Sequence, residues 1–513
     1  MLRTRILDED SPYVTDESKI KGNADLLLIP DNEDDIIEAV KAADASRIPI
    51  TVSAMRTGMS GGCVPFGGNV LTVEKLNKVI GAGKDDKGFF IRIQPAVTVR
   101  DLNELIRKKA YSKLKDITEG AVAELIAGKD HFYPIDPTEL NSSIGGNIAT
   151  NASGPRTLKY GPTRDRVRRL RIILSDGSVL DLKRGDIVGV GREFTISFGA
   201  KERKITIPSY DFNMNVKNSA GVMCRDNMDL IDLFVGSEGL FGIVTEADVY
   251  ITEWHPLMSN ILFFPSDQDA YSFVKELRTT GIEPEFLEFL DSRAIDLIRE
   301  VRKIDPRFTG MPELPDPGCA CVFMDLPIDS DLKDTYSLLG KIAENHGGSL
   351  DNSWCGHELR DRERFFGFRH SVPQTMFERT AAMKDKPRNL HKMGSDMSVP
   401  LDRLDDMVDV YNSELDAQGL DRVTFGHIGN GHLHMEIMLD SVDDFNRAKI
   451  AYHNMAEKAI EFGGSPSAEH GIGKIKREYI RLLYGDKGVE EIKALKTQLD
   501  PNWIFSPGNM VDR

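Results

Sequence analysis

Three glycine-rich segments in the first half of the chain constrain its fold more than any other feature. They are "RTGMSGGCVPFGG" at 56–68, "DPTELNSSIGGNIATNASGPRTLKYG" at 136–161 and "LFVGSEGLFGIVTEA" at 233–247. In the first segment, glycines let backbone N–H groups face one concave point, which suits a phosphate, although a wide surface loop fits the pattern as well. The segment has neither the GxGxxG of a Rossmann turn nor the lysine of a P-loop.

The other two glycine-rich segments indicate close backbone approach. Segment 136–161 combines a Gly-Gly pair with many hydroxyl and amide side chains, and such a loop between apolar strands is suited to wrapping a large polar cofactor. Segment 233–247 carries three glycines within a strand-like apolar run, where glycine usually marks a bulge or a close neighbour.

Strands and helices alternate in the first half of the chain. A strand at 26–30 precedes a helix that Asn32 can cap, and a hairpin is expected at the Asp176-Gly177 turn. From about residue 256 the pattern changes to strands separated by amphipathic helices, which predicts an α+β sheet with its helices on one side. The expected strands of this part lie at 259–265, 285–291, 319–327 and 396–400.

Composition excludes several classes of function. The formal net charge of −16 argues against a nucleic-acid partner, because phosphate binding needs clustered Lys and Arg. The five cysteines form no CxxC repeat, so we expect no iron–sulfur cluster within the chain. The N-terminus lacks the apolar stretch of a secretory signal, and no window approaches about 18 apolar residues. We therefore expect a cytoplasmic protein with reduced thiols.

A histidine-rich segment near the C-terminus is a candidate metal site. In "FGHIGNGHLHMEI" (425–437), His432, His434 and Glu436 alternate with apolar residues, and His427 lies just upstream. On a strand, the alternating side chains share one face. Two imidazoles and a carboxylate suit Zn²⁺, whereas a partly exposed strand without a metal is the alternative interpretation.

A second motif places an acid directly beside an imidazole. In "SAEHGIGK" (467–474), Glu469 and His470 are adjacent and precede Gly471 and Gly473. Alone, this pair fits a surface turn. Together with the histidine-rich segment, it supplies a further carboxylate ligand and a group able to act as a general base.

In this order, the motifs resemble those of the FAD-linked oxidoreductases of the vanillyl-alcohol oxidase/PCMH fold, and among them the D-lactate, glycolate and D-2-hydroxyglutarate dehydrogenases. The resemblance runs from about residue 25 to about residue 510 and includes "LDPNWIFSPG" at 499–508. It implies an α+β fold with a two-subdomain PCMH-type FAD-binding domain at 1–255 and an antiparallel-sheet substrate (cap) domain at 256–455. A helical C-terminal segment at 456–513 would return to the FAD domain and the active site.

The resemblance assigns the glycine-rich segments to FAD. Ala54, Met55 and Arg56 stand where the family pattern GGNTGMVGGSVP has Gly, Gly and Asn, and Ser153 replaces a usual glycine. The first segment has no histidine, so we expect FAD to be held without a covalent bond. The residues that would hold FAD are Arg56, Thr57, Gly58, Met59, Ser60, Gly61, Gly62, Pro137, Ser142, Ser143, Gly145, Gly146, Asn147, Thr150, Asn151, Ser153, Gly154, Gly239, Gly242, Ile243 and Val244.

The resemblance also assigns the histidines. In the family pattern HxGDGNLH the metal ligands stand at the positions of His427 and His434, Glu469 completes the set, and His470 matches the catalytic base. Asn430 replaces the family Asp, and His432 replaces the family Asn. His432 then has three open roles, as a fourth metal ligand, a second acid/base or a polar contact, and we give it a substrate-facing catalytic role.

A substrate carboxylate requires a cation. Arg369 in "FFGFRHSVP" (365–373) matches the family's carboxylate-binding arginine, and a guanidinium can bind a carboxylate through two N–H groups. A surface arginine on a helix is the alternative. Lys392 lies near the place of a second carboxylate-binding lysine, but its spacing to Asp396 matches poorly.

The implied reaction is oxidation of a D-2-hydroxy acid to the 2-keto acid, with hydride transfer to flavin N5. D-lactate, glycolate and D-2-hydroxyglutarate are the expected substrates. Electrons would pass to an external acceptor, namely an electron-transfer flavoprotein, an iron–sulfur subunit, a cytochrome or a quinone. A homodimer and a peripheral position at the inner membrane through a partner are both compatible with this reading. A metallohydrolase, a flavin-dependent alkyl transferase of the same fold and a non-catalytic electron-transfer subunit are the alternatives.

Overall fold

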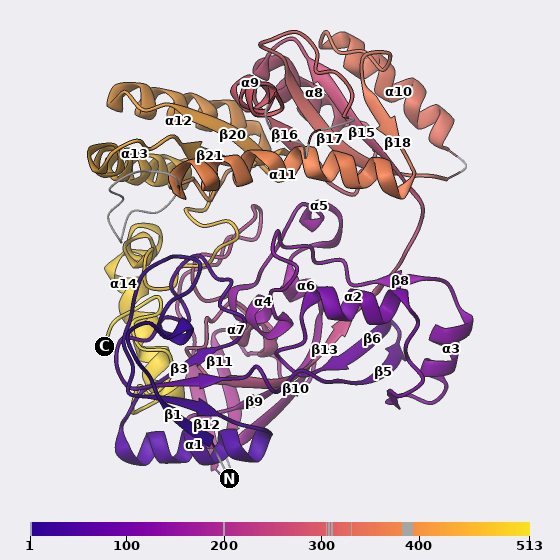
Figure 1. The fold of residues 1–513 in the computed structure, drawn as a ribbon. Helices are drawn as coiled ribbons and strands as arrows, with labels where there is room; N and C mark the ends of the chain where they lie inside the picture. The colour runs from indigo at the N-terminus through magenta and orange to yellow at the C-terminus, as the bar shows by residue number, and fades with distance from the viewer. Residues whose placement is uncertain are drawn as a thin grey trace.

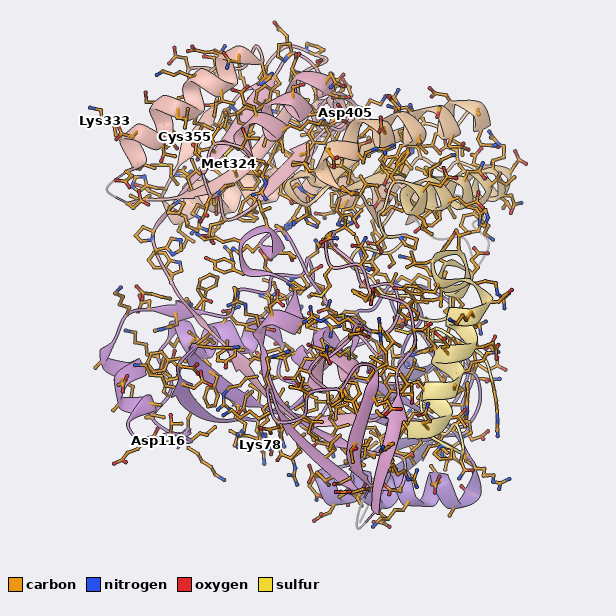
Figure 2. All side chains as sticks on the ribbon, turned by 180° about the vertical axis from the view of Figure 1, so that it is seen from behind. Lys78, Asp116, Met324, Lys333, Cys355 and Asp405 are labelled. Atoms are coloured by element: carbon orange, nitrogen blue, oxygen red, sulfur yellow. The ribbon has the colours of Figure 1, made fainter. Side chains whose placement is uncertain are left out.

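The computed structural model describes residues 3–198, 201–303, 305, 308, 311–329, 331–381 and 393–513. The chain forms two halves, with the strands up to β14 in the lower half of Figure 1 and the seven-stranded sheet in the upper half. Figure 2 shows both halves from behind, with Lys78 and Asp116 on the lower half and Met324 and Cys355 on the upper half.

A four-stranded sheet contains the N-terminal strands, in the order β1-β2-β4-β3. Strand β2 pairs in parallel with β4, and β4 pairs in parallel with β3. Helix α1 begins after Asn32, whose Oδ1 accepts the N–H of Asp35 at 3.0 Å, and it buries Ile36 and Val40. The predicted cap is thus confirmed. The bounds are β1 Arg3–Ile6, β2 Leu26–Ile29, α1 Glu33–Ser46, β3 Ile50–Ser53 and β4 Asn69–Thr72.

A six-stranded sheet follows, in the order β10-β9-β13-β6-β5-β7. Strands β9 and β10 form the hairpin predicted at Asp176-Gly177, and Gly177 adopts a positive φ of 77° in its turn. The bounds are β5 Val79–Asp85, β6 Gly88–Ile93, β7 Lys115–Asp116, β9 Val167–Ile173, β10 Val179–Lys183 and β13 Ile243–Tyr250. Shorter elements surround this sheet, namely α2 Val99–Arg107, α3 Ala121–Ala127, β8 His131–Phe132, α4 Ile144–Thr150, α5 Thr157–Tyr160, α6 Thr163–Arg166, α7 Ile231–Phe234 and β14 Thr252–Glu253.

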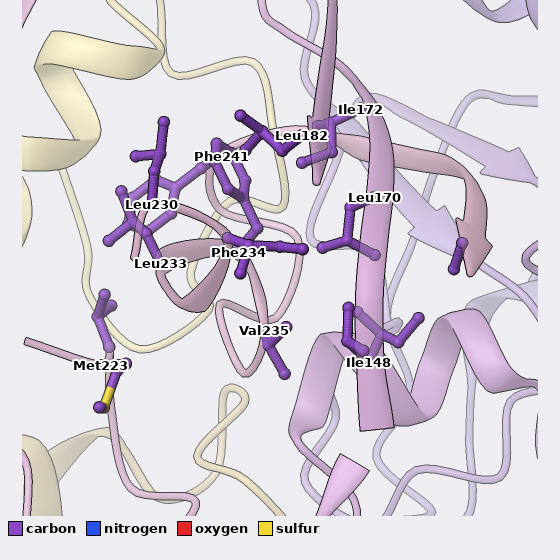
Figure 3. Packing of buried hydrophobic residues seen from close by; sticks show 14 of the residues in the cluster. Ile148, Leu170, Ile172, Leu182, Met223, Leu230, Leu233, Phe234, Val235 and Phe241 are labelled. Carbon is purple, nitrogen blue, oxygen red and sulfur yellow. The ribbon is translucent and has the colours of Figure 1, made fainter. Parts of the chain in front are cut away.

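Apolar residues of the third glycine-rich segment anchor this sheet. Figure 3 shows Phe234, Val235 and Phe241 packed near Leu170 of β9 and Ile148 of α4. Full burial of such side chains contributes about 1.5–3 kcal/mol each. The segment therefore has a fixed position against β9, and this position brings Gly239 and Gly242 to the cavity described below.

Residues 186–230 include a two-stranded hairpin, β11 Glu193–Phe198 with β12 Lys201–Thr206. It contacts α14 Arg477–Leu499, where the N–H of Thr206 donates to Gln498 Oε1 at 2.9 Å. Just after the hairpin, Ser209 Oγ donates to Glu491 of the same helix. The hairpin thus joins the C-terminal helix to the lower half.

The upper half is built on a seven-stranded sheet, in the order β18-β15-β17-β16-β20-β21-β19. All the strand pairs described for it are antiparallel. The bounds are β15 Leu257–Phe264, β16 Leu287–Leu290, β17 Ala320–Pro327, β18 Trp354–Gly356, β19 Met397–Ser398, β20 Arg422–His427 and β21 His432–Ile437. The helices are α8 Asp267–Leu277, α9 Ser292–Val301, α10 Leu332–Asn345, α11 Leu359–Ala381, α12 Leu404–Gln418 and α13 Val442–Glu461.

Helices cover both faces of this sheet, so the prediction of helices on one side was wrong. Leu262 and Phe264 of β15 pack in the cluster that contains α8 and α10 residues. Ile261 and Phe263 alternate with them and pack in the cluster that contains α9 and α11 residues. The physical reason is that both faces of the strand are apolar, and an apolar sheet face must be covered.

The C-terminal segment returns to the lower half. Figure 1 shows α14 beside the lower half, and the N–H of Ile50 in β3 donates to the carbonyl of Ile504 at 2.6 Å. The predicted boundary between residues 455 and 456 lies inside α13. Within the described residues, no helix combines the length and apolar character needed to cross a membrane.

Candidate active site

A cavity of about 1690 Å³ is lined by residues of both halves. Its volume exceeds the roughly 300–1,000 Å³ of a typical small-ligand pocket, so a cofactor and a substrate can fit together. Most residues predicted to hold FAD line it, namely Arg56, Thr57, Gly58, Met59, Ser60, Gly62, Pro137, Ser142, Ser143, Gly145, Gly146, Asn147, Thr150, Ser153, Gly239, Gly242, Ile243 and Val244.

The first glycine-rich segment is tied to the turn that follows His470. Ser60 Oγ donates to the carbonyl of His470 at 2.9 Å, and the Ser60 carbonyl accepts the N–H of Lys474 at 2.9 Å. Gly473 has a positive φ of 52°, and a Cβ there would lie 2.1 Å from the Ser60 carbonyl oxygen. Only glycine allows this approach, which joins segment 56–68 to the C-terminal motif.

The second segment presents polar atoms to the cavity that lack protein partners. Ser142 Oγ, Ser153 Oγ and Asn147 Nδ2 are buried, and none has a hydrogen-bond partner among the described residues. Buried polar groups without partners are costly. These atoms therefore fit a polar ligand such as the predicted FAD.

Three of the predicted FAD residues do not line the cavity. A Cβ on Gly61 would lie 2.5 Å from the side chain of Ile20, and Asn151 Oδ1 accepts the N–H of Arg164. Gly154 packs against the backbone, where a Cβ would meet the carbonyl oxygen of Asp136 at 2.2 Å. These residues shape the two loops rather than face the cavity.

Four potential metal ligands lie close together, and three of them line the cavity. His427, His432, His434 and Glu469 each offer one ligand atom, and these four atoms lie within 4.8 Å of one another. Strands β20 and β21 form a hairpin that pairs His427 with His432, so alternate residues bring the imidazoles to one face. His427 Nε2 lies 3.0 Å from Glu469 Oε1, and His434 Nε2 lies 3.6 Å from Glu469 Oε2.

In two of the imidazoles, Nδ1 already lies beside a hydrogen-bond acceptor. His427 Nδ1 is hydrogen-bonded to Glu288 Oε1, and His434 Nδ1 lies 3.1 Å from the Ser395 carbonyl oxygen. Such bonds fix the ring orientation and leave Nε2 free for a metal, as in known metal sites. The donor set therefore fits a divalent ion.

Opposite charges surround Glu469 and Glu288. Lys217 Nζ forms an ion pair with Glu469, and both side chains are almost fully buried. Burial raises the pKa of Glu469, but Lys217 and His427 outweigh it and hold that pKa well below its usual range. Burial also raises the pKa of Glu288, but His427 and Arg369 outweigh this effect and lower that pKa to about 2. Both carboxylates are thus anionic.

His470 lies beside this cluster and is held by a buried carboxylate. His470 Nδ1 is 3.3 Å from Asp396 Oδ2, and Lys476 Nζ lies 2.6 Å from the same oxygen. Burial raises the pKa of Asp396, but His470 and Lys476 lower it well below its usual range. The His470 ring stacks on His434 with centroids 5.8 Å apart. Because Asp396 is negatively charged, it favours the proton on Nδ1 of His470. Nε2 of His470 is then the basic atom.

Arg369 also lines the cavity, where its charge is partly compensated. Its Nε donates to Glu288 Oε2 at 2.7 Å, and its guanidinium lies 4.7 Å from the ring centroid of Phe425. The guanidinium of Arg369 carries further N–H groups that can bind a substrate carboxylate. The predicted Lys392 lies outside the described residues. His432 is fully buried and is not among the residues that line the cavity.

Sequence reasoning missed four residues that organise this site. Lys217 lies in segment 186–230, which had no assigned role, and Asp396 was considered only for its spacing to Lys392. Glu288 stands within the apolar strand "LEFL", and a charged residue buried in such a run is a usable signal of a partner. Glu238, from the third segment, accepts the N–H groups of Ile472 and Gly473 at 2.7 and 2.6 Å.

Two family descriptions match the chain. The FAD binding domain matches residues 24–114 and 117–183, and the C-terminal domain of FAD linked oxidases matches residues 258–510. The glycolate oxidase subunit GlcD of Bacillus subtilis (strain 168) is 28% identical over 491 residues, which cover 95% of this chain and 88% of the relative. A probable mitochondrial D-lactate dehydrogenase of Danio rerio is 26% identical, with 95% and 84% covered.

A solved structure has the same fold. The crystal structure of p-cresol methylhydroxylase with substrate bound superposes with a TM-score of 0.64, covering 98% of this chain and 92% of the other at 14% identity. At that identity the likeness concerns the fold alone. The chain is an FAD-linked oxidase of the PCMH/vanillyl-alcohol oxidase fold, an oxidoreductase whose distant homologues are glycolate, D-lactate and D-2-hydroxyglutarate dehydrogenases.

Proposed function

We propose that the protein is an FAD-dependent dehydrogenase that oxidises a D-2-hydroxy acid, such as D-lactate, glycolate or D-2-hydroxyglutarate, to the 2-keto acid. One observation carries this proposal. His470, Arg369 and two of the imidazoles, those of His427 and His434, line the same cavity as residues of the three glycine-rich segments. A hydroxy acid placed there would meet a base, a cation and the expected position of the flavin.

The roles of the residues follow from their chemistry. Bound FAD would accept the hydride from the substrate carbon, and a divalent ion held by His427, His434 and Glu469 would polarise the hydroxyl. Zn²⁺ is one candidate for that ion, as expected from the sequence. His470 takes the hydroxyl proton through Nε2, because Asp396 lies at its Nδ1. Arg369 receives the carboxylate through its N–H groups.

The electrons must then leave the flavin for an acceptor outside the chain. The five cysteines are free and have no cluster spacing. An electron-transfer flavoprotein, an iron–sulfur subunit, a cytochrome or a quinone would meet this requirement.

The test is anaerobic reduction of the bound flavin by a panel of D- and L-2-hydroxy acids. We expect bleaching by at least one D-enantiomer, and a decrease of about 10²–10⁴ in the reduction rate for His470→Asn. His357→Asn, which changes an exposed histidine before α11, serves as the control. Bleaching by none of the acids would refute the proposed reaction.

The same measurements separate the alternatives. A metallohydrolase needs no flavin chemistry, so a protein that binds no FAD would favour it. An alkyl transferase of the same fold would bind FAD and yet show no net reduction by a hydroxy acid.

A further inference from the structure

We infer that His432 is a fourth protein ligand of the metal site, so that this chain binds its divalent ion through three imidazoles and one carboxylate. The inference deepens the proposed function, because it concerns the same site. It departs from the pattern HxGDGNLH, in which the position of His432 carries an asparagine. The predicted substrate-facing role of His432 is thereby replaced.

His432 is a fully buried histidine whose ring nitrogens, Nδ1 and Nε2, make no hydrogen bond within the described residues. A buried polar group without a partner costs about 1–3 kcal/mol. A ligand bond to a metal would satisfy one of these nitrogens.

The ring of His432 also lies close to the other three candidate ligands. One ring nitrogen of His432 belongs to the group of four ligand atoms that lie within 4.8 Å of one another. Its ring centroid lies 4.4 Å from that of His434 and 5.3 Å from that of His427. The hairpin register sets this arrangement, because His432 is paired directly with His427 across β20 and β21.

Two other roles fit the contacts less well. His432 does not line the cavity, so it has no access to a substrate there. Its Nε2 lies 3.5 Å from Asp396 Oδ1, which is long for a hydrogen bond. Asp396 already accepts the N–H groups of Glu469 and His470 and binds Lys476. That carboxylate does not depend on His432.

A fourth ligand changes which metal suits the site. Four protein ligands complete the tetrahedral set that zinc adopts in structural sites. A site that also receives a substrate oxygen therefore favours an ion that accepts five or six ligands. Among first-row ions that bind imidazole and carboxylate, Mn²⁺, Fe²⁺ and Co²⁺ meet this condition.

The test counts the imidazoles bound to Co²⁺, which is added to the FAD-loaded protein after removal of other metals. In proton NMR, the ring N–H of each cobalt-bound imidazole gives a separate, strongly shifted signal that disappears in heavy water. Because His432 is fully buried, exchange of its N–H is slow enough to observe. We expect three such signals in the wild-type protein, two in His432→Asn and three in the control His357→Asn.

Two signals in the wild-type protein would overturn the inference even if His432→Asn did not fold. Three signals that persist in a folded His432→Asn variant would also overturn it. We further expect Co²⁺ affinity to fall at least about tenfold in His432→Asn, since even the loss of a group outside the ligand set costs 10–100-fold. The count requires no hydroxy acid, so failure of the proposed reaction and failure of this inference give different results.

Discussion

Replacing Asp396 with asparagine tests whether this buried carboxylate positions His470. Asp396 is only 1% exposed. Its Oδ2 lies 2.6 Å from Lys476 Nζ and 3.3 Å from His470 Nδ1, and it accepts the N–H of His470 at 3.1 Å. Asparagine preserves the shape of the side chain but keeps a single acceptor oxygen and no charge.

The cost to stability can be worked from these bonds. Hydrogen bonds to charged groups contribute about 1.5–3 kcal/mol each. Breaking a buried ion pair by removing one partner costs about 3–5 kcal/mol, and Lys476 would lose its carboxylate partner. We therefore expect Asp396→Asn to lose about 3–5 kcal/mol of unfolding free energy. Domains are stable by about 5–15 kcal/mol, so a folded population remains for assay.

The effect on the rate should be separate from the effect on stability. Without the carboxylate, the His470 ring loses the contact that keeps the proton on Nδ1 and Nε2 basic. Loss of the equivalent carboxylate in a catalytic triad lowers the rate by about 10⁴, and general-base effects span about 10²–10⁴. We expect flavin reduction at saturating substrate to slow within that range, with FAD content and apparent substrate affinity nearly unchanged.

The assay is anaerobic stopped-flow reduction of the flavin, and Asp325→Asn is the matched control. Asp325 is fully buried on β17 and is paired with Arg362 at 3.1 Å, so Asp325→Asn also separates a buried carboxylate from its cation. A folded Asp396→Asn variant that is reduced at the wild-type rate would falsify the positioning role. Equal slowing in Asp325→Asn would show that lost stability alone explains the effect.

Three further changes test other contacts. Burial raises the pKa of Asp232, but Arg164 and Arg184 lower it below its usual value. The folded protein therefore binds fewer protons than the unfolded chain, and this stability is complete above about pH 4 and lost as the pH falls below it. Asp232→Asn should lose about 3–5 kcal/mol at neutral pH and flatten the acid side of a plot of unfolding free energy against pH. Lys217→Met removes the cation paired with Glu469. Because unit charges 4 Å apart interact by about 4 kcal/mol near a protein surface, chelator competition should then find metal binding at least about tenfold tighter. Unchanged affinity would contradict this expectation. Gly473→Ala should impair FAD retention, because its Cβ would lie 2.1 Å from the Ser60 carbonyl oxygen. Gly463 also has a positive φ, but a Cβ there would meet no atom within 4 Å, so Gly463→Ala should retain FAD.

The parts of the fold that follow from local patterns were predicted from the sequence. The Asn32 cap and the Asp176-Gly177 hairpin depend on neighbouring residues only. The placement of helices on both faces of the seven-stranded sheet was missed, although β17 carries the signal. Its sequence "ACVFMDLP" is almost continuously apolar and buried, and such a run indicates burial on both faces.

The candidate site was predicted less completely, because its organising contacts join distant positions. Lys217 and Glu469 are 252 residues apart, and Glu288 and His427 are 139 residues apart. No spacing in the sequence brings such pairs together. The residue types of the cluster were visible, whereas the charges that hold it in place required the fold.

The adjacency of Glu469 and His470 has a structural explanation in the turn that carries them. Glu469 points to His427 and His434, whereas His470 points to Asp396. Ser60 of the first glycine-rich segment donates to the carbonyl of His470 in this turn, and Glu238 of the third segment accepts the N–H groups of Ile472 and Gly473. The loops predicted to hold FAD therefore also fix the proposed base and one metal ligand. It follows that FAD binding and metal binding should be coupled, since each orders a part of the same turn.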